Sequence, residues 1–157
     1  MIQRIQSLYL LISGLLAALC LQIPFFNASD GEGLTLVSGA FKSTLAAGES
    51  PILVEKHFYV GLAAAFTAIL SLALIFMYKN RPLQMKIARL SVLLHTLLLV
   101  LMFYAVEEGK SLDPTFKDSV QYGISIVFPI AGMVLSFLAS RAIMMDEALV
   151  RSSERLR

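Results

Sequence analysis

The sequence predicts an all-α membrane protein: a four-helix transmembrane bundle with a small β-hairpin in its first outer loop. Three observations predict this fold: an apolar composition, four long stretches without charge, and an alternation of charge sign between those stretches. Hydrophobic residues make up 57% of the 157 residues and charged residues 15%, whereas about 25% of the residues of a soluble domain are charged. We expect a single integral membrane domain, residues 1–157.

The charge deficit is confined to four stretches that contain no Asp, Glu, Lys or Arg. These stretches are residues 8–26, 58–78, 90–106 and 119–140. As helices with about 1.5 Å rise per residue they measure roughly 26–33 Å, which matches a hydrocarbon core of about 30 Å. Helices are expected because lipid offers the backbone no hydrogen-bond partner. With flanking residues, the predicted spans are about 5–26, 57–78, 87–106 and 119–140.

The charges between these spans sort by sign. One set of segments holds nine of the thirteen basic residues: Arg4, Lys79, Arg81, Lys86, Arg89, Arg141, Arg151, Arg155 and Arg157. The other set, 27–56 and 107–118, holds eight of the eleven acidic residues. Because cytoplasmic loops are enriched in Lys and Arg, we expect both termini in the cytoplasm, outer loops at 27–56 and 107–118, and a cytoplasmic helical tail at 141–157.

The first span is expected to be an uncleaved anchor, since it exceeds the roughly 7–15 apolar residues of a signal peptide. Pro24 is expected to end or kink its helix at the outer end. Cys20, the only cysteine, follows the bulky Leu19, where a lipoprotein site needs a small residue. We therefore expect Cys20 to be a buried small hydrophobe.

The first outer loop carries two segments typical of short strands, 33–38 and 52–55, which are rich in aliphatic and β-branched residues. Since a loop of about thirty residues is unusual unless it folds or functions, we expect a small β-hairpin or cap there. A mobile loop is the alternative.

The connection between the second and third spans, residues 79–82, is so short that these two helices must be antiparallel neighbours. Pro82 suits the first position of the third helix. Pro129 falls in the middle of the fourth span, 119–140, and is expected to kink it.

His95 is the ionisable residue inside a predicted span, with Ser91 one helical turn away on the same face. An intramembrane ionisable residue is a functional hypothesis by default, and the alternatives are a ligand or proton site and structural hydrogen bonding. The spans contain no acids for a proton relay, which favours the structural interpretation. Gly132, Ser136 and Ser140 recur at helical spacing, which lets helices approach closely in lipid.

His57 is expected near Glu107, Glu108 and Asp113 at the outer surface. Such a group could bind a divalent metal or perform acid–base chemistry, but no HExxH or similar spacing is present, which favours a solvated acidic rim. We therefore expect no catalytic, cofactor-binding or metal site. Nine scattered basic residues without an aromatic platform also argue against nucleic-acid binding.

The cytoplasmic tail is expected to be a helix with one apolar stripe, formed by Ala142, Met145, Leu149, Ser152 and Leu156. Arg151, Arg155 and Arg157 are the candidate contacts of this tail with a partner protein or with lipid. An idle helix is the alternative.

Three segments together indicate a family: MIQRIQ at 1–6, KNRPLQ at 79–84 and DEALVRSSERLR at 146–157. With them the chain resembles, over its whole length, a family of small four-span inner-membrane proteins of Bacteroidota that is known only as a domain of unknown function. The resemblance implies a bacterial inner membrane, a four-span topology and an accessory role. It implies no activity, ligand or site residue.

We predict a non-enzymatic accessory or assembly subunit of a bacterial inner-membrane complex, whose partners are the lipid bilayer and another membrane protein or a second copy of the chain. The alternative is a small homo-oligomeric transporter or channel, with His95 and nearby hydroxyl groups lining a path. Against it, transport pathways usually contain acids and broken helices.

Overall fold

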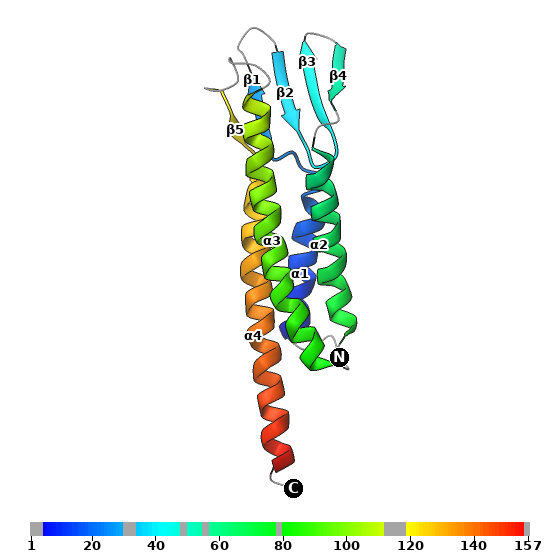
Figure 1. Ribbon diagram of the computed structural model, residues 1–157, viewed down its shortest axis with the longest axis vertical. Coiled ribbons are helices and arrows are strands. Elements are labelled where there is room, and N and C mark those ends of the chain that lie inside the picture. Colours follow the sequence, from blue (N-terminus) through cyan, green and yellow to red (C-terminus); the bar gives the residue numbers. More distant parts are fainter. Residues whose placement is uncertain are drawn as a thin grey trace.

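The computed structural model describes residues 5–29, 34–47, 50–54, 57–77, 80–111 and 119–155. Within these residues the fold is mostly helical, with a small antiparallel sheet at one end of an elongated helical bundle (Figure 1). The four α-helices are α1 (Ile5–Leu19), α2 (Phe58–Phe76), α3 (Arg81–Lys110) and α4 (Val127–Arg155). A short 3-10 helix, η2 (Ile124–Ile126), leads into α4.

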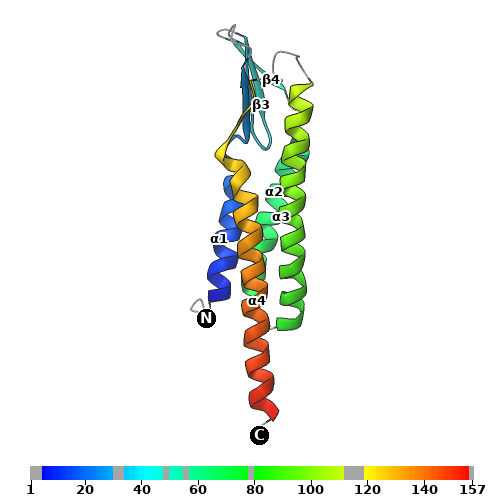
Figure 2. The ribbon, with the colours of Figure 1, turned by 90° about the vertical axis from the view of Figure 1, so that its left-hand side faces the viewer.

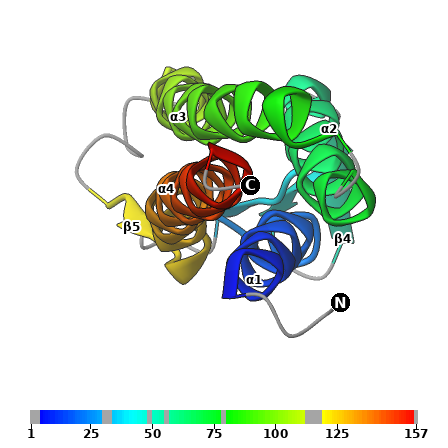
Figure 3. The same ribbon diagram turned by 90° about the horizontal axis from the view of Figure 1, so that it is seen from below.

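The helices run alternately up and down, and each packs against two neighbours. Helix α1 contacts α2 and α4, and α3 contacts the same two helices, so the four form a ring when viewed along the bundle (Figure 3). The predicted antiparallel arrangement of α2 and α3 is present. Asn80 caps α3 by accepting a hydrogen bond from the backbone N–H of Leu83 at 3.4 Å, and Pro82 lies in the first turn.

Three helical segments are long and apolar enough to cross a membrane: Phe58–Phe76, Pro82–Lys110 and Ile124–Leu149. Helix α1 is also apolar but has only 15 residues. The expectation that the first helix reaches residue 26 is wrong, because α1 ends at Leu19 and a turn follows. In that turn the backbone N–H of Gln22 donates to the Leu19 carbonyl at 3.1 Å, and Pro24, which has no N–H, cannot donate the hydrogen bond that would continue α1 through residue 24.

The sheet has five strands: β1 (Phe26–Ser29), β2 (Leu34–Ser38), β3 (Ser43–Ala47), β4 (Ser50–Val54) and β5 (Gln121–Tyr122). Their order is β4-β3-β2-β1-β5, and every neighbouring pair is antiparallel. The segment predicted to be the first outer loop therefore forms part of a small sheet, but the predicted two-stranded hairpin is wrong, because the sheet has five strands. The two predicted strands correspond to β2 and β4, and β3 lies between them. We did not predict β3 because its sequence, STLAA, has little β-branched content.

Helix α4 begins later than the predicted fourth span, because the chain first passes through β5 and η2. The backbone N–H of Gly123 donates to the Phe25 carbonyl at 2.8 Å, which joins this segment to the start of the sheet. Pro129 is therefore the third residue of α4 and not the middle of a span. Proline is tolerated in a first helical turn, so the reason for expecting a mid-span kink at Pro129 is removed.

The bundle has an apolar exterior and a core that contains polar side chains. Large apolar side chains are exposed along all four helices, for example Leu11, Leu15, Phe66, Ile69, Leu93, Val100, Val134 and Phe137. Two apolar clusters fill the core. The inner one, toward the start of α3, contains Leu10, Leu74 and Ile143, and the outer one, below the sheet, contains Phe25, Phe26, Leu98 and Met102.

The sheet rests against the outer end of α3, which continues upward beside it (Figures 1 and 2). The fully buried Phe26 ring of β1 contacts α3 at Gly109, where a Cβ atom would lie 2.5 Å from the ring carbon Cζ. The absence of a side chain at Gly109 thus allows the sheet to approach the helix.

Candidate functional site

The candidate site is a hydrogen-bonded network in the core of the bundle, between the two apolar clusters. It consists of five side chains, which we call the Ser–His network: Ser13 of α1, Ser71 of α2, Ser91 and His95 of α3, and Ser136 of α4. Every helix contributes at least one residue. All five are 0% exposed to solvent.

The network forms one continuous chain of hydrogen bonds. Ser71 Oγ lies 3.1 Å from Ser91 Oγ, which lies 3.3 Å from Ser136 Oγ. Ser136 Oγ lies 2.9 Å from Ser13 Oγ, and Ser13 Oγ lies 3.1 Å from His95 Nε2. His95 Nδ1 returns to its own helix, at 2.8 Å from the Ser91 carbonyl oxygen.

The donor in each of these hydrogen bonds can be assigned by starting from the Ser91 carbonyl, whose role is known. The Ser91 carbonyl can only accept, so His95 Nδ1 carries the hydrogen and Nε2 of the neutral ring accepts. The Ser13 hydroxyl then donates to Nε2, Ser136 donates to Ser13, and so on back to Ser71. The bonds between the serine hydroxyls then point toward the imidazole, and the single Ser13 hydrogen is shared between His95 Nε2 and the Gly132 carbonyl oxygen.

Close helix packing allows these short side chains to meet. A Cβ atom at Gly132 of α4 would clash with the His95 ring atoms Cδ2 and Nε2, so glycine is needed where α4 crosses the imidazole. The Gly132 carbonyl also lies 3.2 Å from Ser13 Oγ as a second acceptor. On α1, a Cβ atom at Gly14 would lie 2.9 Å from the Leu72 side chain of α2. Small residues at these crossings bring the helices within reach of a serine hydroxyl.

The sequence singled out His95 and Ser91, and the structure places them together at the centre of this network. Sequence reasoning did not identify Ser13, Ser71 or the hydrogen bond between Ser136 and Ser13. The signal was present, since each of these serines interrupts an apolar stretch. Their partners, however, are up to 123 residues away in the chain, and one sequence does not show which helix faces which.

Chemically, the Ser–His network is closed. None of its side chains has exposed surface, so a solute has no contact with His95 in this conformation. A satisfied buried network specifies one packing arrangement, because any other would leave polar groups unpaired in an apolar core. The network is suited to holding four helices in register.

A second polar cluster lies at the junction of bundle and sheet, where the sequence placed a metal or acid–base alternative. His57 is 1% exposed, and its Nδ1 lies 3.4 Å from the Tyr59 hydroxyl and 3.8 Å from Glu108 Oε2. The Tyr59 hydroxyl donates to Glu108 Oε2 at 3.1 Å. Glu107 pairs instead with Lys110 at 2.7 Å, and Asp113 lies outside the described residues.

Two observations describe what this outer cluster can do. Within the described residues, no group of three or more His, Cys, Asp or Glu side chains is placed to hold a metal ion. The His57 ring is surrounded by aromatic rings, with centroids of Phe25 and Phe26 at 6.1 and 6.3 Å. The sequence favoured a solvated position for His57, but the structure buries its ring among aromatic side chains. The contacts of His57 thus connect the sheet with α2 and α3.

The predicted tail contacts lie on the end of α4. This helix continues to Arg155, so Arg151 and Arg155 are on its last turns, and Arg157 lies outside the described residues. Met145 and Leu149, on the predicted apolar stripe, are 64% and 68% exposed. The view in Figure 1 shows the last turns of α4 extending beyond the ends of the other three helices.

The sequence matches the model of one protein family, described as Domain of unknown function (DUF4293), over residues 2–156. Since the match covers nearly the whole chain, the protein belongs to this family, and the resemblance inferred from sequence to a family without known activity is confirmed. A comparison with curated proteins finds no match.

Proposed function

We propose that this member of the DUF4293 family is a four-span protein of a bacterial inner membrane. We further propose that it is a non-enzymatic assembly subunit that binds another membrane protein through the cytoplasmic end of α4. The observation that carries the proposal is the extension of α4 past the bundle, with Leu149 exposed where the extension begins and Met145 exposed one turn earlier on the same face.

The exposed surface of all four helices supports insertion of the whole bundle. The exposed side chains of α1 include Leu8, Leu11 and Leu15, at 40–51% exposure, comparable with those of the three longer helices. An apolar surface that surrounds a bundle with a polar centre fits lipid and not water. Helix α1 alone would span about 22 Å, and the chain after it completes the crossing.

The non-helical chain after α1 is compatible with membrane depth because its backbone is bonded within the protein. The Phe25 N–H donates to the Ser38 carbonyl at 2.9 Å, and the Phe25 carbonyl accepts from Gly123. Irregular backbone is tolerated at membrane depth where the protein itself satisfies it. Four spans would place both termini on the side of Lys86, Arg89 and Arg141, the cytoplasm by the positive-inside bias.

The end of α4 supports a docking role. Pro82, in the first turn of α3, lines a common hollow with Ala148 of α4, so the bundle ends near this level. Beyond this level the helix continues to Arg155. Leu149 is exposed at the start of this extension, and Met145 is exposed on the same face one turn nearer the bundle. An amphipathic helix presenting apolar anchors at i and i+4 is suited to the groove of a partner protein. The closed Ser–His network favours this structural role over a transport path.

The test is purification of the tagged protein from its own membrane in mild detergent, followed by native mass measurement and identification of bound subunits. We expect a stoichiometric foreign membrane subunit, which is lost in the double variant Met145→Glu, Leu149→Glu. The neutralised double variant Arg151→Ala, Arg155→Ala should weaken the complex. Both variants should remain in the membrane fraction.

A matched control is Glu154→Gln, which changes one tail charge on the helix side opposite the stripe by the 3.6-residue period, and which should retain the subunit. Unchanged co-purification with the Met145 and Leu149 variant would refute the docking role. A homo-oligomer without any foreign subunit would favour the transporter alternative.

A further inference from the structure

A hollow of about 350 Å³ lies between α3 and α4 near the cytoplasmic end of the bundle. It is lined by Arg89 and Val92 of α3 and by Phe137, Ser140, Arg141 and Met144 of α4. The residues from α4 are spaced i, i+3, i+4 and i+7, so they form one face of that helix. Two arginines from different helices, Arg89 and Arg141, thus line one cavity whose remaining lining is largely apolar.

The lining of this hollow changes polarity along the bundle axis. Arg89 is the last cation before the charge-free stretch 90–106, and Arg141 is the first cation after the stretch 119–140. Val92 and Phe137 lie one turn farther into the apolar region on the same two helices. The charged part of the hollow therefore lies at the level of the lipid headgroups, and the apolar part lies toward the hydrocarbon core.

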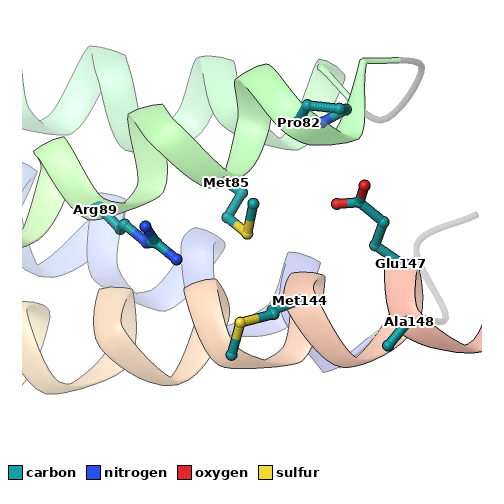
Figure 4. Close-up of a pocket in the computed structure, with 6 residues that line it drawn as sticks. All are labelled: Pro82, Met85, Arg89, Met144, Glu147 and Ala148. Carbon is teal, nitrogen blue, oxygen red and sulfur yellow. The ribbon is translucent and has the colours of Figure 1, made fainter.

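A second hollow, of about 280 Å³, adjoins the first and shares Arg89 and Met144 with it. Its other lining residues are Pro82, Met85, Glu147 and Ala148. In Figure 4 the Met85 thioether lies between the Arg89 guanidinium and the Glu147 carboxylate. Met85 thus separates the Glu147 carboxylate, the acidic group of the groove, from Arg89. Lys86 is exposed near Arg89 but lines neither hollow.

We propose that the groove formed by these two hollows binds one anionic phospholipid of the inner leaflet. The headgroup phosphate lies between Arg89 and Arg141, and an acyl chain follows Val92 and Phe137 into the bilayer. Guanidinium groups donate paired hydrogen bonds to phosphate oxygens, and a basic residue at the membrane surface attracts anionic lipid. A lipid is favoured over free phosphate because only a lipid has an acyl chain that can contact the apolar half of the lining. This inference rests on the proposed membrane insertion.

The experiment uses the absence of tryptophan from the chain. Phe137→Trp places a single fluorophore at the groove, and Phe66→Trp places one on α2 as a matched control. Both parent rings are about half exposed, at 51% and 56%. Each full-length variant is reconstituted in phosphatidylcholine bilayers that contain a minor fraction of brominated phosphatidylglycerol or brominated phosphatidylcholine, and quenching is compared.

In the Phe137→Trp variant we expect brominated phosphatidylglycerol to quench more strongly than brominated phosphatidylcholine, with an apparent preference of roughly fivefold for each arginine engaged. When Arg89→Gln and Arg141→Gln are added, the preference should disappear, whereas Lys86→Gln, which removes the same charge from the same helix, should retain it. In the Phe66→Trp control the two lipids should quench equally in every background.

Equal quenching of the groove fluorophore by both lipids, or a preference that survives loss of both arginines, would overturn the lipid site. Abolition of the preference by millimolar inorganic phosphate would assign the groove to a soluble phosphate and overturn it as well. Lack of quenching by either lipid in both tryptophan variants would refute membrane insertion itself, so the two failures are distinguishable.

Discussion

The imidazole ring of His95 on α3 packs directly on the backbone of α4 at Gly132, where a Cβ atom would clash with ring atoms Cδ2 and Nε2. The ring cannot turn away without loss, because Nδ1 is bonded to the Ser91 carbonyl and Nε2 to Ser13. The contact therefore fixes the separation of α3 and α4 at the centre of the bundle. It also explains why a glycine occurs in the interior of a helix, where it lowers helix stability.

The variant Gly132→Ala is expected to destabilise the bundle. Alanine favours a helix over glycine by about 1 kcal/mol, but the added methyl group meets a ring held by two hydrogen bonds, and overpacking costs about 1–3 kcal/mol. Thermal unfolding in mild detergent should show a lower midpoint. Val134→Ala, on the exposed side of the same helix, should change it little, and a raised midpoint for Gly132→Ala would contradict the close contact.

The Ser–His network should appear as an energetic coupling between α1 and α3. In a double-mutant cycle of Ser13→Ala and His95→Ala, we expect a coupling of about 0.6 kcal/mol, with an upper limit of about 1.7 kcal/mol, as for other hydrogen bonds between membrane helices. Reversible unfolding in mixed micelles provides the four stabilities. Strict additivity would mean that the hydrogen bond at 3.1 Å contributes nothing to the bundle.

The sheet should depend on Phe26 for its attachment. This ring is fully buried between α3 and the His57 ring, and a Phe→Ala change in a core costs about 3–5 kcal/mol. In Phe26→Ala we expect faster trypsin cleavage after Lys42, an exposed residue between β2 and β3, while the helical bundle stays folded. Val37→Ala, on the exposed side of β2, should leave the cleavage rate unchanged.

Much of the helical part of the fold was predictable from composition and charge. The charge-free stretches located four helices, and the short connection at 79–82 fixed α2 and α3 as antiparallel neighbours. The outer ends were not predictable in the same way. Gln121 and Tyr122 look like the start of an apolar helix, but they pair with Asn27 and Phe26 of β1, a contact between segments almost a hundred residues apart.

Only two members of the Ser–His network, His95 and Ser91, were predictable from the sequence, because the others depend on contacts between distant segments. His95 attracts attention as an ionisable residue in a charge-free stretch, and Ser91 follows from helical spacing. Ser13 and Ser71 could be identified as network members only from the packing, since a lone serine in an apolar helix often bonds its own backbone, as Ser140 does with the Phe137 carbonyl at 2.8 Å. The exposure of the α4 stripe likewise depends on where the other helices end.

The central claim is that all four helices, including the short α1, cross the membrane, so that the two termini share one side. The most direct measurement is labelling of single cysteines in intact and permeabilised cells, in a Cys20→Ala background that removes the only native thiol. We expect Lys42→Cys, in the exposed connection between β2 and β3, to react with an impermeant maleimide in intact cells. Gln3→Cys, before α1, and Lys86→Cys, at the start of α3, should react only after the inner membrane is permeabilised. Labelling of residues 3 and 42 from the same side would show that α1 does not cross and would contradict the four-span account.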